Sequence, residues 1–288
     1  MVTAKKILFV NLYGIGNCIL STPTISALKS LGFVVTVLVT RSRCSDVAFK
    51  DWAEVNIIYY NDVPVVLDRA FSFVLWAHPV RQGVVFGGEK SLCVNPNPQS
   101  ALPYHFRFTR HEVIEVLDLA RRLGYSGGIP AVRAPYRTCG IGLPARSVAI
   151  GIGYLKNGKW NQKHWGNTNF VDLCNELKKA GFNPVLFGDE IDNVIDGQVI
   201  EKEADVTNLC GKLALEESLG TIARCIGYIG NDTGAMHAAA AFGMPTLGVF
   251  CATDPVKNAP WGQCGRVLAG RPNARTVWSL FCELVRNK

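Results

Sequence analysis

The chain has 288 residues with a formal net charge of +7, and 48% of them are hydrophobic. That length accommodates two domains of ordinary size, each with a core of its own. No apolar run approaches the roughly 20 residues of a membrane span. The ten cysteines form no CxxC pair, so they indicate neither a zinc site nor a disulfide framework.

The N-terminus and the spread of charge suggest where the protein works. The opening "MVTAKKILFVNLYG" has too short an apolar run for a signal peptide and lacks a small-residue cleavage site, so it is typical of a first strand. Isolated cysteines fit a reducing compartment. We therefore expect a cytoplasmic protein, with peripheral contact at the anionic inner face of the membrane as an option. Its basic charge fits anionic ligands, and no motif indicates nucleic acid.

The first half of the chain alternates strands and helices. A strand over "KKILFVN" precedes a helix over "NCILSTPTISALKSLG", and "FVVTVLVT" is the continuous β-branched run of a strand buried on both faces. Two further strands are predicted over "VNIIYYN" and "FSFVLWA", and an amphipathic helix over "RHEVIEVLDLARRLG". A segment rich in Gly and Pro follows, and we place the linker at 136–147.

The same pattern restarts after the linker. Strands are predicted over "SVAIGIG", "NPVLFG", "IGYIG" and "PTLGVF", with helices between them over "FVDLCNELKKAG", "LEESLGTIARC" and an alanine-rich run. This alternation on both sides of a linker predicts an α/β protein with two open parallel sheets. We expect an N-terminal domain at 1–135, a C-terminal domain at 148–274 and a closing helix at 275–288.

Ligands of such sheets bind beyond the carboxyl ends of the strands, so the residues there are candidate site residues. After the first strand, Gly14 and Gly16 allow a tight turn and close backbone approach, and Asn17 lies near the N-cap of the next helix. This loop is no dinucleotide fingerprint, because "GIGNCI" lacks the third glycine of GxGxxG. His78 follows "FSFVLWA", and Glu190 follows "NPVLFG".

The stretch "GNDTGAMHAAAA" ends a strand and begins a helix at once. Backbone N–H groups at 233–236, with the helix dipole behind them, would bind a phosphate group. Thr233 adds a hydroxyl donor, Gly234 lets a diphosphate approach, and His237 can donate to a phosphate oxygen. Asp232 would repel phosphates, so it either accepts from a sugar hydroxyl or caps the helix. A plain capped helix with His237 packed on the sheet fits the same residues equally well.

Several motifs in fitting order then point to a family. "GNDTGAMHAAAAFGMPTLGVFCATDP" has the order D-T-G-x-x-H-x-A-x-A, a small-residue–Pro step, a strand and a Thr-x-Pro loop. It is preceded by a glycine loop in "ILFVNLYGIGNCILSTPTISALK", a Lys-x-Trp loop in "KHWGNTNFVDLCNELKKAGFNPVLFGDE" and a Gly-Lys turn in "NLCGKLALEESLG". These motifs resemble those of glycosyltransferase family 9, the heptosyltransferase-type enzymes of lipopolysaccharide core assembly.

The resemblance implies a GT-B architecture, in which two Rossmann-like parallel-sheet domains face a central cleft. It implies inverting transfer of a heptose-like sugar from a nucleotide diphosphate donor, similar to ADP-heptose, to a lipopolysaccharide or other surface-glycan acceptor, with no metal and no other cofactor. A helix N-terminus and a lysine can supply the charge stabilisation that a divalent ion would otherwise give. By match to the family's motifs, Lys163 contacts the diphosphate, with Lys156 and Lys159 as backups, and Glu190 holds the ribose hydroxyls.

One residue departs from the family's pattern. Characterised heptosyltransferases carry an aspartate, read as the base for the acceptor hydroxyl, where this chain has Asn17. A neutral amide cannot take up a proton at physiological pH. His78 is our candidate for a replacement base, with His105 and His111 as further options. Alternatively the reaction needs little base help, or the protein binds a sugar nucleotide without transferring it, or it is a GT-B-like epimerase or hydrolase.

The acceptor side of the site is expected in the first glycine loop and the helix after it. Besides Gly14 and Gly16, this places Ser21 and Thr22 of "LSTP" in the first turn of the helix. Their hydroxyls would bind the acceptor or cap the helix.

Overall fold

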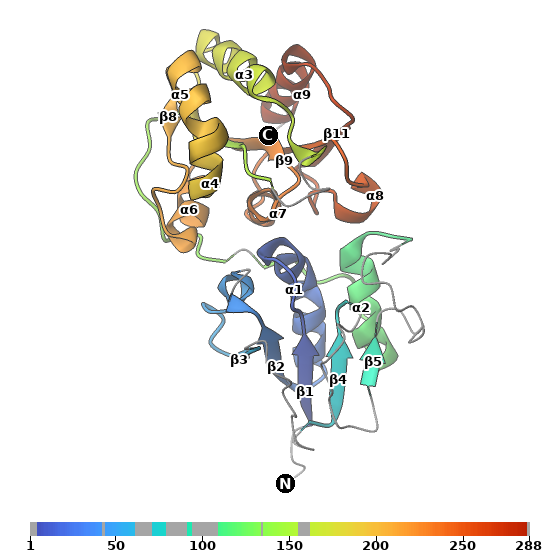
Figure 1. The fold of residues 1–288 in the computed structure, drawn as a ribbon. Helices are drawn as coiled ribbons and strands as arrows, with labels where there is room; N and C mark the ends of the chain where they lie inside the picture. The colour runs from blue at the N-terminus through green and yellow to red at the C-terminus, as the bar shows by residue number, and fades with distance from the viewer. Residues whose placement is uncertain are drawn as a thin grey trace. The chain divides into compact units, whose positions relative to one another are not determined.

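A computed structural model describes residues 5–41, 44–60, 71–78, 91–93, 109–133, 135–154 and 162–286. The chain divides into two compact units, Met1–Arg133 and Ala134–Lys288, each built on its own parallel sheet (Figure 1). His105, Lys156 and Lys159, which the sequence offered as alternatives, lie outside the described residues.

In the first unit the strand order is β3-β2-β1-β4-β5, and every neighbouring pair is parallel. The order reverses between β1 and β4, so the ends of these two strands form the switch point at which α/β sheets bind ligands. The elements are β1 (Lys6–Val10), α1 (Ile15–Ser30), β2 (Val34–Val39), the 3-10 helix η2 (Ser45–Ala48), β3 (Asn56–Tyr59), β4 (Phe73–Trp76), β5 (Ser91–Cys93) and α2 (Glu112–Arg122).

The first sheet is held by apolar strands and by two helices that pack against each other. Leu8, Leu38 and Trp76 from β1, β2 and β4 belong to one buried cluster. Full burial of a side chain of this size contributes about 1.5–3 kcal/mol. Helix α1 packs on both β2 and α2, and it is buried along most of its length because its apolar residues surround the axis. This packing fixes the N-terminus of α1 beside the end of β1.

In the second unit the strand order is β11-β10-β9-β6-β7-β8, again parallel throughout. Counted from β6, this is the order 3-2-1-4-5-6 of the Rossmann fold, with its switch point between β6 and β9. The elements are β6 (Ser147–Gly151), α3 (Asn167–Lys179), β7 (Asn183–Phe187), α4 (Glu190–Asp192), the π-helix η4 (Asn193–Gly197), α5 (Gln198–Ala204), β8 (Thr207–Asn208), α6 (Leu215–Ile222), β9 (Gly227–Asn231), α7 (Gly234–Ala241), β10 (Thr246–Phe250), α8 (Pro255–Asn258), β11 (Gly265–Ala269) and α9 (Ala274–Arg286).

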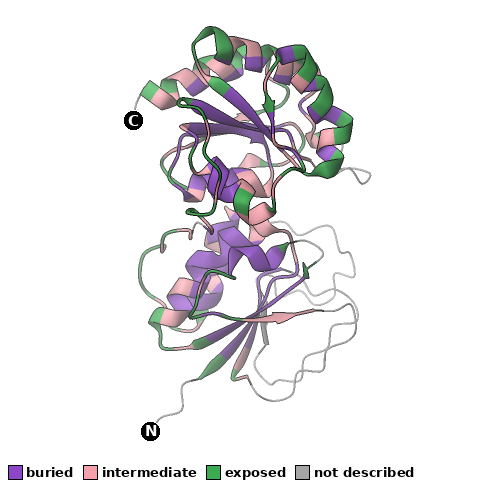
Figure 2. Cartoon of the chain, turned by 90° about the vertical axis from the view of Figure 1, so that its left-hand side faces the viewer, coloured by how far each residue is buried: buried purple, intermediate pink, exposed green. Residues whose placement is uncertain are grey.

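Side chains of α3, α5 and α9 form the core on one face of this sheet, with Phe170, Ile200 and Phe281 among them. Helix α7 packs against β9, β10 and α6. The inner strands of both sheets are mostly buried, whereas the edge strands β3 and β11 are not (Figure 2). Since buried parallel strands cannot expose their edges to ligand, the polar residues that follow them are the ones available for chemistry.

Two glycines let the strands at the second switch point approach closely. A Cβ on Gly230 of β9 would collide with the backbone of Gly151 in β6, and a Cβ on Gly151 would collide with the Tyr228 side chain. Glycine is therefore required at both positions. Among the described residues, none of the helices combines the length and apolar character needed to cross a bilayer.

Candidate functional site

The carboxylate of Asp232, which follows β9, gathers three side chains at the edge of the second sheet. Its Oδ2 accepts hydrogen bonds from Lys163 Nζ at 2.9 Å and from Thr253 Oγ1 at 2.8 Å. Lys163 Nζ also donates to the Asp232 backbone carbonyl at 3.2 Å. On the other side of the carboxylate, His237 Nε2 lies 3.7 Å from Oδ1. The structure thus brings Lys163 of the Lys-x-Trp motif together with Asp232 and His237 of the D-T-G-x-x-H motif.

The electrostatics of this cluster depend on burial. Asp232 is 7% exposed, and burial alone would raise the pKa of its carboxyl. The close approach of His237 and the charge of Lys163 outweigh that effect and hold the pKa of Asp232 well below its usual range. Asp232 therefore carries its negative charge at neutral pH and fixes the Lys163 ammonium beside it.

The segment that carries Lys163 is anchored on both sides. Trp165 is 1% exposed, packs edge-on against Phe170 with ring centroids 5.0 Å apart, and donates from Nε1 to the Pro272 carbonyl at 2.7 Å. Arg271 donates to the His164 carbonyl at 2.8 Å. The aromatic residue of the Lys-x-Trp motif is thus a structural anchor, which leaves the lysine at a defined place.

Helix α7 begins beside this cation. Its N-cap is Thr233, with an extended backbone and no side-chain capping bond, so the suggestion that Asp232 caps the helix is wrong. The Met236 amide donates to the Thr233 carbonyl at 3.1 Å. Of the amides that the sequence offered at 233–236, those of Gly234 and Ala235 remain in the first turn, where a helix has no internal acceptor.

Two buried polar atoms flank this helix start. Asn231 Nδ2 donates to the carbonyls of Ile152 and Gly153, at 3.1 and 3.2 Å, and so ties the end of β9 to the end of β6. Asn231 Oδ1 and His237 Nδ1 are buried, and neither has a hydrogen-bond partner among the residues that the structure describes. Such atoms are costly in a stable core and are characteristic of a functional site.

Glu190 stands at the end of the neighbouring strand β7, as the first residue of α4. The side chains of Asp189 and Asp192 form a capping box around it, and its own side chain is exposed. The backbone of Gly211 lies directly behind Glu190: φ of Gly211 is +68°, and a Cβ there would lie 2.7 Å from Glu190 Cα. The Gly-Lys turn thus supports Glu190 from behind.

The sequence did not predict a further polar group at the end of β6. The ring of Tyr154 lies 4.7 Å from that of His164, and His164 Nε2 lies 3.6 Å from the buried Asp196 carboxylate. Burial, followed by the negative charge of Asp196, raises the pKa of Tyr154 to about 12. Tyr154 therefore stays protonated at neutral pH and can act as a hydrogen-bond donor.

A second cluster of side chains lies at the switch point of the first sheet. It surrounds Glu112, which the sequence analysis did not name. Asn17 is the third residue of α1, and its Nδ2 donates to Glu112 Oε1 and Oε2 at 3.1 and 2.9 Å. His78 Nε2 lies 3.3 Å from Glu112 Oε1, and the ring of Tyr13 packs on the His78 ring at 4.1 Å. Glu112 is the first residue of α2 and is fully buried. In the sequence, only its position on the core-facing side of the predicted helix could have drawn attention to it.

The acceptor-side candidates in α1 differ from expectation. Ser21 and Thr22 are fully buried in the second turn of α1 and donate to the carbonyls of Cys18 and Ile19, so they neither cap the helix nor face solvent. Gly14 is the N-cap of α1, with an ordinary φ of −72°. A Cβ there would meet open space, so the residue leaves room at the helix start but makes no tight turn. Gly16, the second helical residue, is half-buried.

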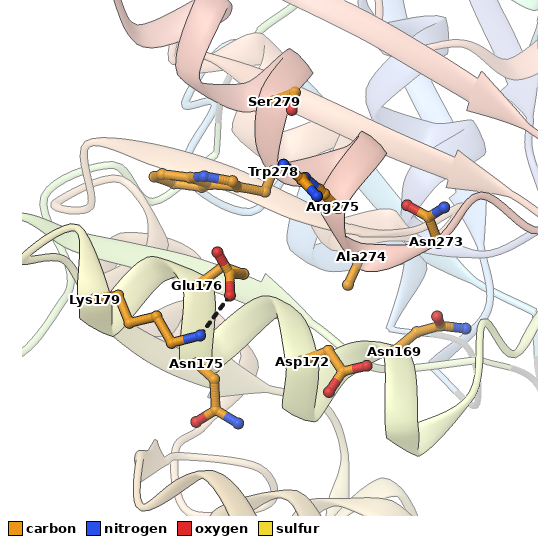
Figure 3. Close-up of a pocket in the computed structure, with 10 residues that line it drawn as sticks. All are labelled: Asn169, Asp172, Asn175, Glu176, Lys179, Asn273, Ala274, Arg275, Trp278 and Ser279. Carbon is orange, nitrogen blue, oxygen red and sulfur yellow. Dashed lines mark hydrogen bonds and ion pairs between the residues drawn. The ribbon is translucent and has the colours of Figure 1, made fainter.

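Two other features carry no candidate chemistry. His111 is the N-cap of α2, where its Nδ1 accepts from the Val113 amide at 3.2 Å, which is a structural role. A polar pocket lies between α3 and α9, and Figure 3 shows Lys179 paired with Glu176 along its wall. None of the candidate site residues lines it. Among the described residues no group of three His, Cys, Asp or Glu side chains could hold a metal ion.

The sequence similarity to known proteins lies in the second unit. Residues 150–276 match the model of glycosyltransferase family 9 (heptosyltransferase). Lipopolysaccharide heptosyltransferase 2 of Salmonella typhimurium is 30% identical over 123 residues, which are 41% of this chain and 35% of that protein. The corresponding protein of Escherichia coli is 29% identical over 123 residues. The matched stretch thus spans about a third of the length of these curated relatives.

Solved structures resemble the whole chain. The structure of E. coli ADP-heptose lps heptosyltransferase II has a TM-score of 0.73 at 17% identity, over 98% of this chain and 99% of that one. A family 9 glycosyltransferase from Veillonella parvula has a TM-score of 0.76 at 15% identity, over 99% and 98%. The predicted α/β class with two Rossmann-like parallel sheets is therefore confirmed, and it is the GT-B fold of the heptosyltransferases. The second unit thus resembles glycosyltransferase family 9 in sequence, and the whole chain shares the fold of its solved members.

The low pKa of Asp232 predicts an acid-dependent contribution to stability. A carboxyl whose pKa is lower in the folded than in the unfolded state stabilises the fold above the unfolded value of about 4, and this contribution is lost as the pH falls below it. We expect the difference in unfolding free energy between the wild type and Asp232→Asn to be largest near neutral pH and to narrow below about pH 4. Urea titrations across pH measure it, and a difference that does not change with pH would contradict the assignment.

Proposed function

We propose that the protein is a glycosyltransferase that moves a heptose-like sugar from a nucleotide diphosphate donor to a lipopolysaccharide or other surface-glycan acceptor. The observation that carries this proposal is the Lys163 ammonium, held by Asp232 beside the N-terminus of α7. Neighbours of the same fold have been solved with ADP and with ADP-2-deoxy-2-fluoro heptose, which supports an ADP-linked sugar as the donor. We infer that the reaction takes place in the cytoplasm, with the acceptor at the inner face of the membrane.

The leaving group explains why these residues are needed. When the bond between the anomeric carbon and the phosphate oxygen breaks, negative charge builds up on the nucleoside diphosphate. The Lys163 ammonium and the positive end of α7 act on the same place, and both are fixed before the reaction begins. Charges that are already oriented stabilise a transition state without reorganisation. We infer from this that departure of the diphosphate needs no divalent ion.

The remaining donor contacts follow from position. Thr233 and Gly234 lie at the start of α7 and would approach the diphosphate, together with His237 from its first turn. Glu190 is exposed at the end of the adjacent strand, where its carboxylate can accept from ribose hydroxyls. On the first sheet, His78 is the proposed base for the acceptor hydroxyl, because the amide of Asn17 cannot take up a proton.

The reaction is tested by ADP release from ADP-heptose, with lipopolysaccharide core fragments of different lengths as acceptors and with EDTA present throughout. We expect release that depends on the acceptor and is unaffected by the chelator. Tight ADP-heptose binding without release for any acceptor would identify a sugar-nucleotide-binding protein that does not transfer. Release that does not need an acceptor would identify a hydrolase.

The donor site is tested by replacing its cation. Lys163→Ala removes a charged hydrogen-bond donor, and the loss of one such bond corresponds to a roughly ten- to hundredfold weaker affinity for ADP. Lys179→Ala is the matched control, because Lys179 pairs with Glu176 on the outer helix α3. Isothermal titration with ADP measures both variants. Equal ADP affinity of Lys163→Ala and the wild type would show that the diphosphate binds elsewhere.

A further inference from the structure

The buried carboxylate of Glu112 has no role in the function proposed above. Glu112 is 0% exposed although it begins a helix, where glutamate is normally solvated. Burial of a charged carboxylate is costly unless donors surround it. The Asn17 amide of α1 donates to this carboxylate, and the His78 ring at the end of β4 lies 3.3 Å from its Oε1. All three elements meet at the switch point of the first sheet.

Glu112 determines the orientation of the Asn17 amide. Both carboxylate oxygens accept from Nδ2, so the amide oxygen of Asn17 points away from Glu112. A flipped amide would place its oxygen against the carboxylate, which is repulsive. Asn17 is half-buried, whereas Glu112 is not exposed at all. Asn17 therefore presents a hydrogen-bond acceptor of fixed direction at the start of α1, beside the open space over Gly14.

The same carboxylate faces one nitrogen of His78. Nε2 is buried and lies 3.3 Å from Glu112 Oε1. A lone pair on Nε2 would point at a negative charge, so the contact favours the tautomer that carries its hydrogen on Nε2. The other nitrogen, Nδ1, is then the basic one. A carboxylate that holds an imidazole in this way also stabilises the imidazolium formed when a proton is taken up.

The surrounding titratable groups allow this arrangement. The ring of Tyr13 covers one face of His78. Cys18 of α1 lies near the carboxylates of Glu112 and of Asp46 in η2. Its burial, and to a smaller extent these two charges, raise the pKa of the Cys18 thiol above its usual range. The thiol therefore stays neutral, and it does not compete for the proton.

We propose that Glu112 is a positioning residue of the transfer reaction, which holds the Asn17 amide and the His78 imidazole together at one edge of the first sheet. The inference rests on the proposed function. The acceptor hydroxyl donates to Asn17 Oδ1 or directly to His78, and its oxygen attacks the anomeric carbon. The bond to the phosphate oxygen breaks, and its electron pair leaves with the nucleoside diphosphate. The hydroxyl proton passes to His78 Nδ1 and from there to solvent, while Glu112 stabilises the imidazolium.

The contact is tested first on the wild-type protein, independently of turnover. The five histidines are resolved by ¹⁵N NMR, with His78→Asn to assign the His78 signals. We expect His78 to be protonated on Nε2 in its neutral form. In Glu112→Gln, which keeps the shape of the side chain, the share of the tautomer protonated on Nδ1 should rise, because the negative charge that faces Nε2 is removed. Glu115→Gln, on the same helix but bonded to Arg110, should leave it unchanged.

Kinetics then test the role in the reaction. For Glu112→Gln we expect kcat to fall by about a hundredfold with the KM for ADP-heptose little changed. A wild-type His78 whose neutral form is protonated on Nδ1, or an unchanged His78 tautomer in folded Glu112→Gln, would overturn the positioning role. If these NMR results are obtained but the wild type releases no ADP with any acceptor, the proposed function is wrong, and so is the reaction step derived from it. The contact between Glu112 and His78 would still be supported.

Discussion

The site in the second unit depends on one buried ion pair, between Lys163 and Asp232. A buried carboxylate is unfavourable alone, and so is a lysine held against the edge of a sheet. Each satisfies the other here, and a hydrogen bond from Thr253 and the nearby His237 ring complete the surroundings of Asp232. The consequence is a cation fixed beside the N-terminus of α7, where a negatively charged leaving group gains from both charges at once.

In both sheets, a buried asparagine at the end of a central strand fixes the loops at the ligand-binding edge. Asn231 ends β9 and bonds to the carbonyls after β6. Asn11 follows β1, donating to Ser21 Oγ and accepting from the Tyr13 amide. An amide has donors and acceptors to bind several backbone groups of a loop without introducing a charge. The loops that carry Asp232 and Asn17 are therefore held firmly, which is what a site that stabilises a transition state requires.

The sequence predicted the larger elements because their patterns are unambiguous. β1, β2 and β10 are continuous apolar runs, and α2 and α3 have one apolar face. The helical stretch 190–204 was not predicted. It consists of α4, the π-helix η4 and α5, and Ile191 and Val194 are exposed, so its apolar residues do not follow one helical period. β5, β8 and β11 were missed as well. The strand at Thr207–Asn208 is too short for any alternation to be visible.

The candidate sites divide in the same way. The donor-side residues lie in short motifs, so Asp232 and His237 could be named from the chain. Thr253 belongs to the Thr-x-Pro loop quoted there, but it was given no role. By contrast, Asn17 and Glu112 are 95 positions apart, and only the packing of α1 on α2 brings them together. The sequence shows that Asn17 stands where the family has an aspartate. It does not show that α2 brings the Glu112 carboxylate next to this amide.

The central claim is that the amides at the start of α7 and the Lys163 ammonium hold the diphosphate. A crystal structure of the protein with ADP, grown in the presence of EDTA, tests this most directly. We predict the phosphate oxygens within hydrogen-bond distance of the Gly234 and Ala235 amides and of Lys163 Nζ. Phosphates bound at another edge of the sheet, or ADP that binds only when a divalent ion is supplied, would contradict it.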